Sequence, residues 1–369
     1  MMRLCLIIYG SLDTLTGGFI YDKFLVEHLD RKGHEVEIVS LAWRRYAKHV
    51  LDNFSATLKS RLTENNYDLI LQDELNHPSL FWFNRKLKKR DADGPPLVSI
   101  VHQVFSSQHQ PWLLNRFFKA VEKVYLRSID AFIFNSETTR RIVHRLINFT
   151  GPSLVACPGG DRLGHLQAAE LIWTRAVQAG PLKMVFVGNL TPIKGLVPLI
   201  DILATLPPAI WRLTVVGSLT MDPAYVRKVK RLISEKNMER NVVLAGPLDG
   251  KELKNVLCTS QLFVMPFSKE GFGIAYLEAM AYGLPVLASA AGAVNEFIHH
   301  GHNGFLFDPA EAGAIAGIIL DLHKNRDRLV KIGQTAMQTA LSKPGWKETM
   351  ESIELFLMGQ AKLRGKRDN

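Results

Sequence analysis

The sequence predicts an α/β protein with two Rossmann-like domains, each built around a parallel sheet. Short apolar runs alternate with helix-forming stretches along the whole chain, a pattern typical of parallel sheets. The apolar runs divide into two groups of six. A chain of 369 residues is long enough to bury two separate cores. The composition, 47% hydrophobic and 22% charged, is that of an ordinary globular protein.

The predicted strands of the first half are Leu4–Tyr9, Val36–Leu41, Leu69–Leu71, Leu97–Val101, Ala131–Phe134 and Leu154–Ala156. Those of the second half are Met184–Val187, Leu213–Val216, Val242–Ala245, Leu262–Met265, Pro285–Ala288 and Phe305–Phe307. A polar stretch between Gly159 and Gly180 separates the two groups, and we expect the linker there. The predicted domains are therefore residues 1–165 and residues 175–343.

The net charge and the cysteine content indicate which partners and which cellular compartment are favoured. The formal net charge of +10 favours an anionic partner, such as nucleotide phosphates, an acidic lipid surface or nucleic acid. The three cysteines have no metal-ligand spacing and no even pairing, which predicts a reducing, cytoplasmic compartment and no structural metal. The apolar run at the N-terminus is too short for a signal peptide, and no apolar run reaches the roughly 18 residues of a membrane span.

Glu270 and Glu278 are the most informative pair of residues in the chain. An apolar run is followed by a glycine-bearing loop and then by a helix-forming stretch that Gly283 closes. This order predicts Glu270 on the loop and Glu278 inside the helix. The free N–H groups near Gly271 and Gly273 would face a phosphate, because the first turn of a helix leaves its amides unpaired. Most glutamate pairs at this spacing lie on the solvated surface. This pair indicates a binding site only because it brackets a junction of strand, glycine loop and helix.

Glycines end three strands of the second half at equal intervals. Gly188, Gly217 and Gly246 lie 29 residues apart, which is about the length of one βα unit. Ligands of open α/β sheets bind outside the carboxyl ends of the strands, and glycine there lets a nucleotide approach the backbone. Three tight turns without a ligand would give the same pattern.

Another glycine pair, Gly17-Gly18, opens a predicted helix after the first strand. Paired glycines at a helix N-terminus can present N–H groups to phosphate, although a flexible turn needs no ligand. No G-x-G-x-x-G fingerprint occurs here, which disfavours a dinucleotide-dependent dehydrogenase.

Polar side chains also follow strands of the first half. His102 lies just past one strand end, where a merely packed histidine is the alternative. Asp73, Glu74 and His77 follow another strand at a density that suits the recognition of hydroxyl groups. For Ser136, which follows a third strand, we favour a helix N-cap over a ligand role.

Together these motifs resemble the family-four retaining glycosyltransferases, which have the GT-B fold. The run from Glu270 to Glu278 is similar to the E-x7-E region of that family, and the segment from Asn189 to Lys194 is similar to its diphosphate-binding segment. The family usually has Arg where Asn189 stands. Because Asn carries no charge, neutralisation of a diphosphate would depend on Lys194, on helix dipoles, or on another basic residue that the sequence does not identify. The resemblance covers most of the chain and is strongest over Val185–Pro309.

The resemblance implies two domains facing across a cleft, with the C-terminal helix crossing back to the N-terminal domain. The break at Pro344-Gly345 and the amphipathic stretch from about Lys347 to Ala361 match that crossover. Residues 346–369 would therefore belong with the first domain. In the family, the first domain binds the acceptor and the second binds the nucleotide-sugar donor.

The implied reaction is retaining transfer of a hexose from a nucleoside diphosphate sugar to an acceptor hydroxyl, with no cofactor and no metal. The implied catalytic residues are His102, Lys194 and Glu270. The implied donor-binding residues are Gly17, Gly18, Gly188, Asn189, Lys194, Gly217, Gly246, Glu270, Gly271, Phe272, Gly273, Ile274 and Glu278. The residues expected to bind the acceptor substrate are Asp73, Glu74 and His77. The expected partners are a nucleotide sugar and an acceptor sugar, lipid-linked or other, and not nucleic acid.

Two other classes of function stay open: a sugar-nucleotide epimerase on the same fold, and a non-catalytic module that binds nucleotide sugars or polyanions. A phosphorylase would need a pyridoxal lysine site, of which the sequence gives no sign. His299, His300 and His302 fall in a predicted turn without further metal ligands. Metal-dependent sugar transferases of the other major fold use a D-x-D pair at a strand end, whereas Asp91-Ala-Asp93 lies in a charged loop. No G-x-S-x-G motif of a hydrolase occurs.

Two segments of the first half, Phe81–Arg90 and Pro111–Arg127, join aromatic to basic residues. Aromatic rings can lie at the level of lipid headgroups, and each basic residue near an anionic surface adds about 1 kcal/mol. The segments predict peripheral docking on an anionic membrane surface, at the inner membrane face, and a lipid-linked acceptor. An ordinary core-facing helix and a solvated charged face are the alternative.

Overall fold

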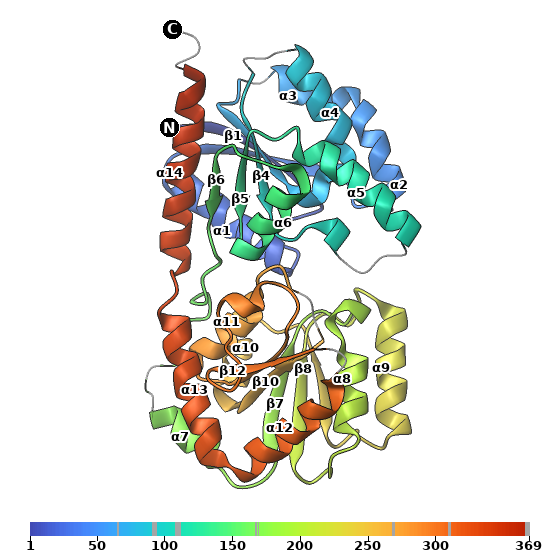
Figure 1. Cartoon of the computed structure of the whole chain (residues 1–369), viewed down its shortest axis with the longest axis vertical. Helices are drawn as coiled ribbons and strands as arrows, with labels where there is room; N and C mark the ends of the chain where they lie inside the picture. Colours follow the sequence, from blue (N-terminus) through green and yellow to red (C-terminus); the bar gives the residue numbers. More distant parts are fainter. Residues whose placement is uncertain are drawn as a thin grey trace. The chain divides into compact units, whose positions relative to one another are not determined.

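The computed structural model describes residues 1–64, 66–90, 94–107, 112–166, 168, 170–267, 270–308 and 311–365. The chain forms two compact units, which Figure 1 shows in colours that follow the sequence. Unit 1 contains Met1–Pro158 and Trp346–Asn369, and unit 2 contains Gly159–Gly345. The sequence prediction drew the first of these boundaries at residue 165.

Unit 1 is built on a six-stranded parallel sheet in the order β2-β1-β3-β4-β5-β6. Its strands are β1 (Arg3–Tyr9), β2 (Glu35–Leu41), β3 (Leu69–Asp73), β4 (Leu97–Val101), β5 (Ala131–Phe134) and β6 (Ser153–Val155). The three middle strands β3, β4 and β5 are buried at every position. Burial on both faces explains why these strands are continuous apolar runs and not alternating ones.

Unit 2 repeats the architecture with the strand order β12-β11-β10-β7-β8-β9, again all parallel. Its strands are β7 (Leu182–Val187), β8 (Trp211–Val216), β9 (Val242–Gly246), β10 (Leu262–Met265), β11 (Val286–Ser289) and β12 (Gly304–Phe307). The twelve predicted strands are therefore all present, with ends that differ from the prediction by two residues at most.

The helices connect successive strands, as parallel pairing requires. Those of unit 1 are α1 (Gly17–Arg31), α2 (Tyr46–His49), α3 (Ala56–Glu64), α4 (His77–Arg90), α5 (Trp112–Leu126), α6 (Glu137–Ile147) and α14 (Trp346–Gly365), with the 3-10 helices η1 (Val50–Phe54), η2 (Glu74–Asn76) and η3 (Phe105–Ser107). Those of unit 2 are α7 (Glu170–Ala176), α8 (Leu196–Leu203), α9 (Pro223–Glu235), α10 (Gly250–Thr259), α11 (Ile274–Ala281), α12 (Ala312–Lys324) and α13 (Arg326–Leu341), with η4 (Pro192–Lys194) and η5 (Ala293–Glu296).

The final helix α14 packs in unit 1 against α1, as expected for a helix that returns to the first domain (Figure 1). The ring of Trp346 is buried and stacks on Phe24, with 4.2 Å between ring centroids. Thr349 Oγ1 donates a hydrogen bond to the Cys157 carbonyl at 2.8 Å. Within the described residues, no helix is long and apolar enough to cross a membrane.

The stretch between Gly159 and Gly180, predicted as the linker, is largely built into unit 2. It contains α7, from which Arg175 is buried. The two terminal nitrogens of Arg175 donate to the carbonyls of Leu257, Cys258, Tyr282 and Gly283, which lie at the C-terminal ends of α10 and α11. These carbonyls have no partner within their own helices, so one guanidinium satisfies the ends of two helices.

Replacing Trp346 with alanine should destabilise unit 1 by about 3–5 kcal/mol, the usual cost of removing a buried tryptophan. The loss should appear as a lower midpoint in urea unfolding followed by circular dichroism. Trp112→Ala is the matched control, because that ring is 69% exposed. Equal effects of the two substitutions would show that α14 is not anchored through Trp346.

Candidate functional site

The three strand-end glycines of unit 2 lie side by side, because β7, β8 and β9 are neighbours in the sheet. The amide of Gly217 donates to the Gly246 carbonyl at 2.9 Å. A Cβ at residue 217 would lie 2.1 Å from the carbonyl oxygen of Gly188, and its φ of +149° also favours glycine. Glycine is thus required at residue 217 by backbone packing alone, whatever binds at this edge.

Lys194 and Glu270 form an ion pair at the same edge of the sheet. Nζ of Lys194 lies 2.5 Å from Oε1 of Glu270, and both side chains are partly exposed, at 27% and 17%. The aliphatic stem of Lys194 passes over Gly188, where a Cβ would lie 3.5 Å from Cδ of the lysine. The two residues that the sequence predicts as catalytic in this unit therefore contact each other.

The backbone around Glu270 is held by Gly292. The two residues form a parallel β-bridge, and a Cβ at residue 292 would lie 2.3 Å from the Glu270 carbonyl oxygen. Phe272, two residues on, is buried against the ring of Phe297. Gly273, with a φ of +99°, is the N-cap of α11 and supplies no side-chain cap. The Tyr276 amide already donates to the Gly273 carbonyl at 3.1 Å, so the amides of Ile274 and Ala275 are the ones that this helix start can offer to an anion.

Glu278 lies inside α11, as predicted, and its carboxylate is buried. Arg162 binds it in a bidentate manner, with Nε 2.6 Å from Oε1 and Nη2 3.1 Å from Oε2. Burial raises the pKa of Glu278, and the charge of Arg162 opposes that rise. Arg162 was not expected from the sequence, because it lies 116 residues away in the predicted linker.

Asn189, which stands where the resembling family usually has Arg, has a local structural partner. Its Oδ1 accepts a hydrogen bond from the Ser218 amide at 3.0 Å and so joins the turns after β7 and β8. An arginine could not accept this bond, because a guanidinium is only a donor.

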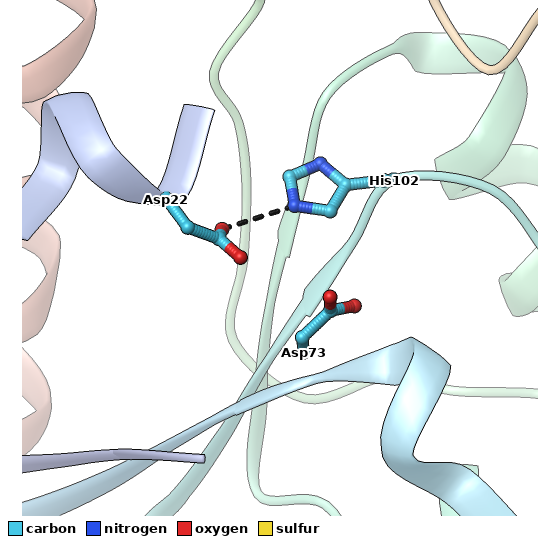
Figure 2. Close-up of side chains that lie close together, drawn as sticks. All are labelled: Asp22, Asp73 and His102. Carbon is cyan, nitrogen blue, oxygen red and sulfur yellow. Dashed lines mark hydrogen bonds and ion pairs between the residues drawn. The ribbon is translucent and has the colours of Figure 1, made fainter. Parts of the chain in front are cut away.

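In unit 1 the helix α1 and the ends of β3 and β4 bring Asp22, Asp73 and His102 together (Figure 2). Oδ1 of Asp22 lies 3.0 Å from Nε2 of His102, and the Asp73 carboxylate lies nearby on the β3 side. Asp22 is fully buried and Asp73 nearly so, whereas the His102 side chain is 16% exposed. Gly18 lies against the ring, because a Cβ at that residue would approach Cδ2 of His102 to 3.0 Å, a closer contact than most side chains make.

These groups shift one another's pKa. Burial and the charge of Asp22 raise the pKa of Asp73 to about 6. Burial alone would lower the pKa of His102, but the charges of Asp22, Asp73 and Glu74 together raise it to about 8. Near pH 7, therefore, His102 is mostly an imidazolium.

Glu74 and His77, predicted as acceptor residues, are buried in a second cluster with Glu122 of α5. Burial raises the pKa of both glutamates to about 8 and lowers that of His77 to about 4. Nε2 of His77 lies 3.0 Å from the Tyr46 hydroxyl, and Glu122 Oε1 accepts from the Phe105 amide at 2.6 Å. A direct contact with an acceptor stays a prediction for these two residues, and it requires this cluster to open.

Both clusters place carboxylate and imidazole atoms within 4.8 Å of one another, a spacing from which a metal ion could in principle be bound. Nε2 of His102 is already hydrogen-bonded to Asp22. Both ring nitrogens of His77 are engaged as well, Nδ1 with the Glu74 carbonyl and Nε2 with Tyr46. Since a metal would have to displace these bonds, we interpret both clusters as hydrogen-bonded acid–imidazole groups.

Ser136 and the histidine-rich turn have the local structures that the sequence predicts. Ser136 is the N-cap of α6, as predicted, and its Oγ accepts from the Thr139 amide at 3.1 Å. His302 and its neighbours form the predicted turn before β12. Asp91, Asp93 and Pro111, which the sequence analysis also named, lie outside the described residues.

Two family models match the chain and leave little of it uncovered. The model for group 1 glycosyl transferases matches residues 169–339, and the model for Glycosyltransferase Family 4 matches residues 21–160. The chain belongs to the family-four glycosyltransferases. The first match lies in unit 2 and the second lies almost wholly in unit 1.

Relatives and solved structures agree with this family. A D-inositol 3-phosphate glycosyltransferase from Pseudarthrobacter chlorophenolicus is 29% identical over 53% of this chain and 47% of its own length. Sucrose-phosphate synthase from Thermosynechococcus elongatus superimposes over the whole of both chains with a TM-score of 0.80 and 21% identity. Anabaena HepE, solved with UDP-glucose, covers 97% of this chain and 100% of its own, with a TM-score of 0.76 and 20% identity. These structures establish the GT-B fold, while the chain spans about half the length of the curated relatives it matches.

Replacing Arg162 with alanine should lower the free energy of unfolding by about 3–5 kcal/mol, because it leaves the buried Glu278 carboxylate unpaired. Arg227→Ala is the matched control, since Arg227 is exposed on α9. The measurement is urea unfolding at pH 7 without ligand. A double variant with Glu278→Gln should recover part of the loss, and no recovery would show that Arg162 acts through other contacts.

Proposed function

We propose that the chain is a retaining glycosyltransferase, which moves a hexose from a nucleoside diphosphate sugar to an acceptor hydroxyl without a metal ion. The observation that carries this proposal is the edge of the unit 2 sheet. There the Lys194–Glu270 pair, the glycine-lined strand ends and the uncapped N-terminus of α11 lie on neighbouring elements. Unit 2 would bind the donor and unit 1 the acceptor.

The chemistry of this edge suits a departing diphosphate. Negative charge develops on the leaving phosphate as the glycosidic bond breaks, and preorganised cations and amides that face it lower the barrier. Lys194 supplies the cation, and the first amides of α11 supply hydrogen-bond donors and a positive helix end. Because these groups can neutralise the charge between them, the proposed mechanism assigns no task to a metal.

The two glutamates would bind the remaining parts of the donor, the transferred sugar and the ribose. Glu270, partly exposed beside Lys194, would accept hydrogen bonds from sugar hydroxyls. Glu278 would hold the ribose hydroxyls, sharing its carboxylate with Arg162. HepE is solved with UDP-glucose, so UDP-hexoses are the first donors to test, with GDP- and ADP-hexoses beside them.

The two alternative functions predict different products. A transferase releases free nucleoside diphosphate and, without an acceptor, slowly releases free sugar. An epimerase returns an altered nucleotide sugar. A binding module raises the melting temperature with its ligand, by about 2.7 kcal/mol of stability at 100 times the dissociation constant, but turns nothing over.

Lys194→Ala should lower the catalytic rate by at least about 100-fold, in the range of lost charge stabilisers. Lys194→Arg should retain part of the rate, because it keeps the charge. Glu270→Ala should reduce turnover of the sugar nucleotide more than binding of the bare diphosphate, and Glu278→Gln should raise the donor KM.

Turnover is measured by release of nucleoside diphosphate, with and without a chelator. Lys228→Ala, an exposed lysine on α9, is the control for loss of a positive charge. A Lys194→Ala protein with normal turnover would exclude the proposed role, and activity that returns only with added magnesium would exclude the metal-free mechanism.

We also propose that unit 1 docks on an anionic membrane surface, where a lipid-linked acceptor would be presented. On α4, Trp82 is half exposed beside Arg85 and Lys86, and the Lys86 ammonium lies 4.7 Å from the centre of the Phe54 ring. On α5, three large apolar side chains are more than half exposed: Trp112, Leu114 and Phe117. The guanidinium of Arg116 lies 5.3 Å from the centre of the Trp112 ring. Exposed aromatics that alternate with cations suit a headgroup region.

Neutralising Arg85 and Lys86 together should weaken binding to anionic vesicles at low salt, measured by co-sedimentation, because each basic residue contributes about 1 kcal/mol there. Lys88 is left in place, since it pairs with Asp130, and the side chains of Lys89 and Arg90 lie outside the described residues. The control removes two exposed charges of unit 2, Arg227 and Lys228.

Binding that survives the α4 change but is lost with the control pair would contradict docking through unit 1. Absence of binding at every lipid composition would favour a sugar or peptide acceptor in solution.

A further inference from the structure

We propose that Asp22 is a positioning residue for His102: it fixes the imidazole through Nε2 and holds the ring as an imidazolium. The inference rests on the proposed function, for which the family resemblance implies His102 as a catalytic residue. Its first test is a measurement on the protein without substrate, so it can fail or succeed independently of that function.

The orientation of His102 is determined on several sides. Oδ1 of Asp22 lies 3.0 Å from Nε2, and a Cβ at residue 18 would lie only 3.0 Å from Cδ2 of the ring. The ring of Tyr21 meets the imidazole edge to face, with 5.1 Å between centroids. The side-chain Nδ2 of Asn135 donates to the His102 carbonyl at 2.8 Å and so fixes the backbone that carries the ring. A ring held at its edge, its face and its backbone has little freedom to turn.

The hydrogen bond to Asp22 also decides which ring nitrogen carries a proton. An ionised carboxylate only accepts, so Nε2 must donate to it. In a neutral ring this would leave Nδ1 as a bare acceptor. In an imidazolium both nitrogens are donors, and Nδ1 can donate to a sugar or phosphate oxygen.

The charges that face His102 favour the imidazolium. Asp22 reaches it from α1 and Asp73 from the end of β3, while the neighbouring Tyr21 is uncharged at neutral pH. Glu74 of η2 also faces the ring, but it adds its charge only as the pH approaches its own pKa of about 8. Oδ2 of Asp22 is buried and has no hydrogen-bond partner among the described residues. Its charge is therefore balanced chiefly through the bond that Oδ1 makes with His102.

The first test is Asp22→Asn, which keeps the shape of the side chain and removes its charge. The pKa of His102, read from the pH titration of its imidazole C–H signal and assigned with His102→Gln, should fall from about 8 by at least roughly one unit, a tenfold weaker proton affinity. Asp30→Asn makes the same change at an exposed position of α1 and should leave this pKa unchanged.

The second test is the pH profile of kcat/KM. In the wild type it should decline above about pH 8, where His102 loses its proton. In Asp22→Asn the decline should begin about one unit lower, so that the loss of activity is small near pH 6, at least about fivefold near pH 8 and about tenfold well above pH 8. Asp22→Glu should restore part of the profile, because it restores the charge.

An unchanged His102 pKa in Asp22→Asn would overturn the inference, as would an activity loss of equal size at every pH, which indicates a purely structural role. If Asp22→Asn does not fold, Asp73→Asn gives the same test with a smaller expected shift, because Asp73 acts on His102 only through its charge. A wild type that titrates as expected but transfers no sugar would reject the proposed function and leave the role of Asp22 in place.

Discussion

Parallel pairing brings the carboxyl ends of the strands to one edge of each sheet, and nearly every candidate residue depends on that edge. In unit 1, Asp73, His102 and Asn135 follow β3, β4 and β5, which are neighbours in the sheet. In unit 2, Gly188 and Glu270 follow β7 and β10, which are neighbours as well. Residues far apart in sequence therefore meet without any special loop, which is why open α/β sheets bind ligands there.

Burial of charge is the second constraint, and the chain meets it by pairing. An ionised group away from water is costly unless a partner or hydrogen bonds compensate it. Asp22 is compensated by His102, Glu278 by Arg162, and Arg175 by four helix-terminal carbonyls. In each case the charge joins segments that the sheet alone does not hold together.

The sequence predicts the strands well because their signal is local. A buried strand such as β4 is an unbroken apolar run, and its end is marked by a polar residue or by glycine. The glycines at residues 18 and 217 are predicted for their place at strand ends and helix starts. The contacts that favour glycine there involve residues 84 and 29 positions away, respectively, and no pattern in the sequence shows them.

The partners in the two sites were missed for the same reason. Asp22 lies 80 residues from His102, and Arg162 lies 116 residues from Glu278. Asp22 does follow Gly18 by four positions, so a helix starting at Gly17 puts both on one face. That spacing was a usable signal, since His102 meets both. Arg162 stands in a polar stretch with no periodicity, and nothing in its neighbourhood marks it.

The charges at the unit 2 edge suggest how a donor would enter. Without ligand, Lys194 is held by Glu270 and Arg162 by Glu278, so each cation already has a carboxylate. On the proposed function, a diphosphate that reaches Lys194 competes with Glu270 for it, and the carboxylate released in this way becomes an acceptor for sugar hydroxyls. One exchange would then prepare both contacts, while the more deeply buried Glu278 would keep its bond to Arg162 and accept the ribose hydroxyls beside it. Asn189 adds no charge to this exchange, because its amide is neutral. The charge that binds the leaving group thus rests on Lys194 and on the N-terminus of α11.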